Sequence, residues 1–84
     1  MSASFSEEVC KLIIDRLCVV FGKAPGEIRP ETNLETDLGA KSVNISQLAN
    51  FIEDEYEAQV SFVELRKRKT VAEIVKYVEE ICEY

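Results

Sequence analysis

The sequence of 84 residues contains no histidine, and only three glycines, two prolines and three cysteines. Without histidine, Ser–His–Asp catalysis, Cys–His catalysis and zinc sites that use histidine are all excluded. Cys10, Cys18 and Cys82 are odd in number and have no paired spacing, so they make a poor metal set. We expect them to pack within helices in a reducing compartment.

Long apolar runs and an excess of positive charge are also missing. No run reaches the roughly 18 apolar residues of a membrane span, and residues 1–4 lack the basic and apolar regions of a signal peptide. We therefore expect a cytoplasmic protein, and we expect it to be a monomer. The net charge of −6 argues against nucleic-acid binding, which needs a basic face. It suits partners with basic patches, and it equally suits simple solubility.

Apolar residues make up 46 % of the chain, which is enough for one core, so we expect a single domain over residues 1–84. Their spacing follows a period near 3.6. It predicts an all-α fold, a small four-helix bundle of three longer helices and one short helix with a long first loop. The expected helices cover residues 4–21, 42–57, 61–66 and 70–83.

Local signals mark the helix ends. Ser4 with Glu7, and Thr70 with Glu73, have the spacing of a capping box at the start of a helix. Gly22 is expected to end the first helix.

The first connection, residues 22–41, is long for a compact domain, and two prolines and Gly26 break regular structure within it. We expect an ordered loop draped over the helices, held by apolar anchors at Ile28, Leu34 and Leu38. A calcium loop over residues 31–37 is disfavoured. No register supplies both the glycine and the glutamate that an EF-hand needs.

Ser42 precedes the apolar stripe of the second helix, which consists of Ile45, Leu48, Ala49, Ile52 and Tyr56. Taken alone, a serine in this position is usually an N-cap. A phosphate on its oxygen would meet unpaired N–H groups and the positive end of the helix dipole, worth roughly 0.3–1 kcal/mol at an exposed site.

The stretch Asp37-Leu38-Gly39-Ala40, then Lys41, Ser42 and an aliphatic residue resembles the attachment motif of acyl carrier proteins. The similarity extends over residues 28–78. It implies that Ser42 carries 4′-phosphopantetheine, transferred from coenzyme A by a phosphopantetheinyl transferase, and that the arm's thiol bears acyl groups as thioesters. The resemblance implies a carrier rather than an enzyme, with acyl-transferring or condensing enzymes as further partners.

The resemblance also implies further sites. We expect partner enzymes to contact the second helix at Val43, Gln47, Glu53 and Asp54, although an exposed valine is unremarkable in general. An acyl chain is expected between the second and third helices, lined by Leu48, Phe51, Ile52 and Phe62. Without the resemblance, the place of Phe51 at the edge of the apolar stripe favours a core residue. Gly39, without a Cβ, suits the close approach of another surface.

Three residues depart from the family pattern, in which they are usually acidic: Lys41, Asn44 and Gln47. Lys41 also places a cation at a positive helix end, which costs a few tenths of a kcal/mol. Two explanations compete. In the first, Lys41 pairs with the phosphate of the arm or selects an unusual transferase and partners. In the second, the protein is a poor substrate for general transferases. The basic run at residues 66–69 fits a solvated helix end, with a partner-binding patch as the alternative.

Two rival interpretations stay open. One is a helical protein-interaction domain without a prosthetic group. The other is a carrier protein that serves a specialised acyl or polyketide pathway and not fatty-acid synthesis. A peptidyl carrier ranks lower because the usual Gly-Gly before the serine is absent.

Overall fold

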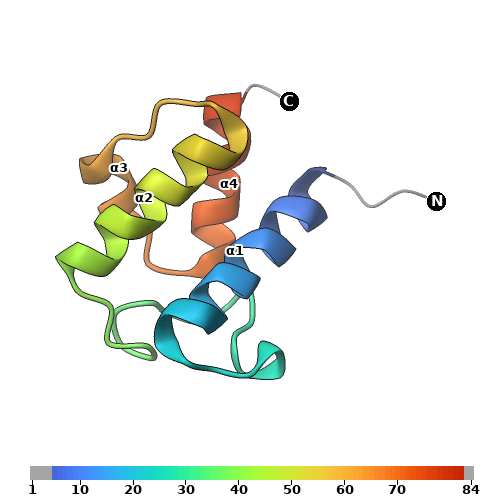
Figure 1. Cartoon of the computed structure of the whole chain (residues 1–84), viewed down its shortest axis with the longest axis vertical. Helices are drawn as coiled ribbons and strands as arrows, with labels where there is room; N and C mark the ends of the chain where they lie inside the picture. The colour runs from blue at the N-terminus through green and yellow to red at the C-terminus, as the bar shows by residue number, and fades with distance from the viewer. Residues whose placement is uncertain (1–4, 83–84) are drawn as a thin grey trace.

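The computed structural model describes residues 5–82. Across them the chain forms four α-helices and one short 3₁₀ helix, in the order α1 (Phe5–Phe21), η1 (Pro25–Glu27), α2 (Ser42–Tyr56), α3 (Phe62–Lys67) and α4 (Val71–Cys82) (Figure 1). The predicted all-α bundle of three longer helices, one short helix and a long first loop is confirmed. The cap proposed at Ser4 and a helix end at Glu83 lie outside the described residues.

The apolar stripes of the helices meet in one core. α1 packs against α4, and α2 packs against α3 (Figure 1). The largest fully buried side chains come from all four α-helices: Val9, Ile13, Ile52, Leu65, Val71, Ile74 and Val78. The Tyr77 hydroxyl adds a polar tie, because it accepts a hydrogen bond of 3.0 Å from the Ser61 N–H ahead of α3.

The helix ends follow the local signals in most places. Gly22 has a left-handed φ of 64° directly after α1, as expected of a terminating glycine. At the start of α4, the Thr70 hydroxyl accepts from the Glu73 N–H at 3.2 Å, and the Glu73 carboxylate accepts from the Thr70 N–H at 3.0 Å. This reciprocal pair is the predicted capping box. Ser61 caps α3 by accepting from the Glu64 N–H at 3.3 Å.

The cysteines lie on helices, as the packing prediction expects. Cys18 is buried, Cys10 and Cys82 are half-buried, and all three are free thiols. No helix within residues 5–82 combines the length and the apolar character needed to cross a membrane. In the same part of the chain, no three His, Cys, Asp or Glu side chains gather where they would hold a metal ion.

The long first loop is an ordered cover over one end of the bundle (Figure 1). Ile28 and Leu34 are each only 2 % exposed. The backbone of the loop also pairs with the segment leading into α4. The Leu34 N–H donates to the Lys69 carbonyl at 2.9 Å, and the Val71 N–H donates to the Thr32 carbonyl at 3.2 Å. The loop therefore reaches α2 from a fixed anchor beside α4.

Candidate functional site

The approach to α2 begins with a side-chain-stabilised turn. The Asn33 side-chain oxygen accepts hydrogen bonds from the N–H groups of Glu35 and Thr36, at 2.9 and 3.0 Å. One Asp37 carboxylate oxygen accepts from the Asn33 N–H at 2.8 Å. Such bonds from Asx side chains to nearby backbone are typical of tight turns. Asp37, which the motif singled out, is therefore engaged in holding the loop, and its partner Asn33 was missed.

Gly39 carries the backbone through the left-handed region, with φ of 67°. A Cβ built at this glycine would meet nothing within 4 Å. Within this chain, glycine is needed here for its backbone conformation and not to make room. The next residue closes the loop, because the Ala40 N–H donates to the Leu34 carbonyl at 2.8 Å. Leu38 and Ala40 are half-buried against the core.

Ser42 is the first helical residue of α2, and Lys41 before it is extended, with φ of −111° and ψ of 173°. The interpretation of Ser42 as an N-cap is therefore wrong. The capping bond instead runs backwards: the Asn44 side-chain oxygen accepts from the Lys41 N–H at 2.9 Å. Ser42 is exposed. Its hydroxyl has no hydrogen-bond partner within residues 5–82, so it stands free beside the unpaired N–H groups of the first turn.

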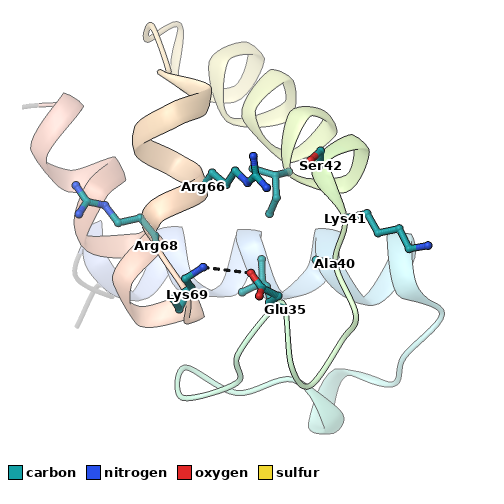
Figure 2. A pocket seen from close by; sticks show the side chains of 9 residues that line it. Glu35, Ala40, Lys41, Ser42, Arg66, Arg68 and Lys69 are labelled. Atoms are coloured by element: carbon teal, nitrogen blue, oxygen red, sulfur yellow. Dashed lines mark hydrogen bonds and ion pairs between the residues drawn. The ribbon is translucent and has the colours of Figure 1, made fainter.

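A pocket of about 290 Å³ opens next to Ser42. It is lined by Leu34, Glu35, Ala40, Lys41, Ser42, Ile45, Arg66, Arg68 and Lys69. Figure 2 shows the Arg66 side chain reaching from α3 toward Ser42, whereas the ammonium end of Lys41 points away from the pocket. Lys69 forms an ion pair of 3.1 Å with Glu35 at the rim. Cations of α3 and of the segment after it are thus brought beside the serine.

The basic run at residues 66–69 is divided among several environments. Lys67 pairs with Glu64 at 3.3 Å on the exposed side of α3. The Arg68 guanidinium lies 5.1 Å from the centre of the Tyr77 ring and 3.8 Å from a Glu80 carboxylate oxygen. Among the described residues the Arg68 Nε is buried without a hydrogen-bond partner. The run is therefore not a uniform solvated helix end, because Arg66 and Lys69 line the pocket while Lys67 does not.

The residues expected to contact partners differ in their freedom. Val43 is 60 % exposed, and Gln47 and Asp54 are also exposed. Glu53 is half-buried, and its carboxylate accepts a hydrogen bond of 2.9 Å from the Val60 N–H. The Glu53 side chain is thus used to hold the connection after α2, which the sequence did not indicate.

The residues expected to line an acyl-chain pocket do not share one environment. Leu48 and Ile52 are buried in the core, and Phe62 is half-buried beside it. Phe51 is likewise half-buried against the core, as expected, and its ring also faces α1, with its centre 5.0 Å from the Arg16 guanidinium carbon. An acyl chain between α2 and α3 would have to displace packed core residues, and the acyl pocket stays a prediction.

Glu73 and two of the cysteines are among the residues with shifted pKa values. The Glu73 carboxyl has a lowered pKa because it accepts hydrogen bonds from the backbone of Thr70 and Lys69. Glu73 therefore holds the segment to which the first loop is anchored. Burial raises the pKa of the Cys10 and Cys82 thiols, which makes them poorer nucleophiles at neutral pH.

Comparison with known proteins gives two findings. A family model described as a phosphopantetheine attachment site matches residues 11–78. The fold is similar to a solved structure of an acyl carrier protein from Enterococcus faecalis, described for its high thermal stability, with a TM-score of 0.76. That similarity has 24 % sequence identity and covers 90 % of this chain and 96 % of the other.

Proposed function

Since this chain belongs to the acyl carrier protein family, in which 4′-phosphopantetheine is attached covalently, we propose that Ser42 is its attachment residue. The protein is a carrier rather than an enzyme. The observation that supports Ser42 is its free hydroxyl, exposed at the first residue of α2 and without a hydrogen-bond partner in the described part of the chain.

The surroundings of Ser42 fit a phosphate ester. Unpaired N–H groups and the positive end of the dipole of α2 favour an anion at this position. The side chains of Arg66 and Lys69 line the adjacent pocket and add positive charge. The left-handed backbone at Gly39 turns the chain toward α2, and Ser42 lies at the surface, where a transferase has access.

In the loading step, Ser42 Oγ is the acceptor. It forms a bond to the phosphorus at the pantetheine end of coenzyme A while the anhydride bond to the nucleotide phosphate breaks. The serine proton passes to a base on the transferase, because this chain has no histidine and no described base contacts the hydroxyl. The attached arm supplies a terminal thiol that carries acyl groups as thioesters.

We place the carrier in the cytoplasm, in a fatty-acid pathway or a specialised acyl or polyketide pathway. Its partners are a phosphopantetheinyl transferase and acyl-transferring or condensing enzymes. The first turn of α2 contains no acidic residue. This composition favours partners that do not rely on a basic patch against that turn.

The test is intact-mass measurement after incubation with coenzyme A and a broad-specificity transferase. Three proteins are compared: wild type, Ser42→Ala, and Ser46→Ala, which removes an exposed hydroxyl one turn further along α2. Wild type and Ser46→Ala should gain the mass of one 4′-phosphopantetheine, and Ser42→Ala should not. Loading of Ser42→Ala, or no loading of wild type, would contradict the proposal, and the second result would favour an interaction domain without a prosthetic group.

A further inference from the structure

The pocket beside Ser42 combines a free cation with an attachment point for an anion. We infer that it is an anion site in which the Arg66 guanidinium, with the Lys69 ammonium, holds the phosphodiester at the root of the arm against α3. The inference rests on the proposed attachment at Ser42 and adds where the phosphate lies once it is attached.

Arg66 is the cation best placed for this contact. Its side chain extends from α3 toward Ser42 across the pocket (Figure 2). Within residues 5–82, Arg66 has no ion pair or hydrogen bond through its side chain, unlike Lys67, Arg68 and Lys69. A planar guanidinium binds two phosphate oxygens at once, which a lysine does not.

The charge at the pocket suits one phosphodiester. Arg66 and Lys69 face Glu35, whose carboxylate pairs with Lys69 at 3.1 Å. Both members of that pair are more than half exposed, so the pair itself contributes little and a neighbouring anion can share the ammonium. This local excess of positive charge occurs in a chain whose net charge is −6.

The other lining cations are placed differently. Lys41 contributes to the wall, but its ammonium points away from the pocket (Figure 2). Arg68 turns toward Tyr77 and Glu80. The contact with α3 would fix the base of the arm and direct the arm over α3, so that a partner enzyme would approach from that side.

The chain offers a matched control. Lys67 lies on the same helix as Arg66 and carries the same charge, but it pairs with Glu64 and does not line the pocket beside Ser42. Arg66→Gln and Lys67→Gln therefore make the same change in net charge, and only the first removes the proposed ligand. Arg66→Lys keeps the charge and removes the two-pronged geometry.

The experiment uses full-length protein loaded by a broad-specificity transferase, with loading verified by intact mass. The ³¹P signal of the phosphodiester and the Nε–Hε signal of Arg66 are recorded. We expect the Arg66 signal to shift between the unloaded and loaded wild type. The ³¹P signal should shift and narrow in Arg66→Gln as the phosphate becomes mobile, change less in Arg66→Lys, and stay as in wild type in Lys67→Gln.

The outcomes separate this inference from the attachment itself. If the protein loads but the ³¹P position and linewidth are the same in wild type, Arg66→Gln and Lys67→Gln, the inference is wrong and the attachment at Ser42 stands. If the protein does not load, the attachment fails and the inference fails with it.

Discussion

Replacing Gly39 by alanine tests how the chain delivers Ser42 to the surface. The φ of 67° at Gly39 costs an L-residue roughly 1–2 kcal/mol. Part of this, about 0.4–1 kcal/mol, is offset because alanine restricts the unfolded chain. Since a Cβ at Gly39 meets no atom within 4 Å, no clash adds to the cost. We expect a net loss of about 1 kcal/mol, which lowers Tm by roughly 4–8 °C in a domain of this size.

Thermal unfolding followed by circular dichroism measures the effect, with two other glycines as controls. Gly26 has no positive φ and open space around its Cβ position, so Gly26→Ala should leave Tm unchanged or raise it. Gly22 has a similar φ of 64° but lies at the end of α1, so Gly22→Ala should lose stability and keep its loading rate. Equal Tm values for Gly39→Ala and Gly26→Ala would show that the left-handed backbone at Gly39 does not require glycine.

Three further predictions concern charge, pH and thiols. A triple variant, Lys41→Asp with Asn44→Asp and Gln47→Glu, places acidic residues at the start of α2. We expect a broad-specificity transferase to load this variant faster than wild type. An unchanged rate in a mass-based assay would contradict this expectation. Because the folded state lowers the pKa of Glu73, its carboxylate stabilises the fold at pH values above the ordinary pKa of 4.5. This contribution is lost as the pH falls through the lowered pKa. Urea unfolding should therefore show a deficit for Glu73→Gln at pH 7 that shrinks in acid, and a deficit independent of pH would count against it. Burial raises the pKa of the Cys10 and Cys82 thiols. In loaded protein below pH 9.0, an alkylating reagent should therefore modify the thiol of the arm before either cysteine. Peptide mapping that finds Cys10 or Cys82 modified first would contradict this.

Much of the fold was predictable because its signals are local. Gly22 ends α1, and the Thr70 and Glu73 pair opens α4, through contacts between residues at most a few positions apart. The apolar stripe of α2 followed the helical period and placed Leu48 and Ile52 correctly in the core. Such features depend on the geometry of one helix and need no knowledge of its neighbours.

The site was harder to predict, because its contacts join distant segments. Arg66 approaches Ser42 only because α3 packs against α2. The Leu34 N–H to Lys69 carbonyl bond, which fixes the loop, joins residues far apart in sequence. No period or motif in a single sequence reports such pairings.

At the start of α2, two local signals competed. A serine ahead of an apolar stripe indicates an N-cap at Ser42. In the structure the Asn44 side-chain oxygen accepts from the Lys41 N–H, and the N-cap is Lys41, one residue before Ser42. The sequence pattern marks Asn44 only as a departure from a usually acidic position. Its amide oxygen has a structural task, as the carboxylates of Asp37 and Glu53 also have.

The proposed carrier function depends on one hydroxyl, that of Ser42, being covalently joined to 4′-phosphopantetheine. Proteolysis of the loaded wild-type protein, followed by fragmentation of the peptide that begins α2, locates the attached group. We expect the added mass to lie on Ser42 and to be absent from Ser46. Added mass on any other residue, or none on this peptide, would contradict attachment at Ser42.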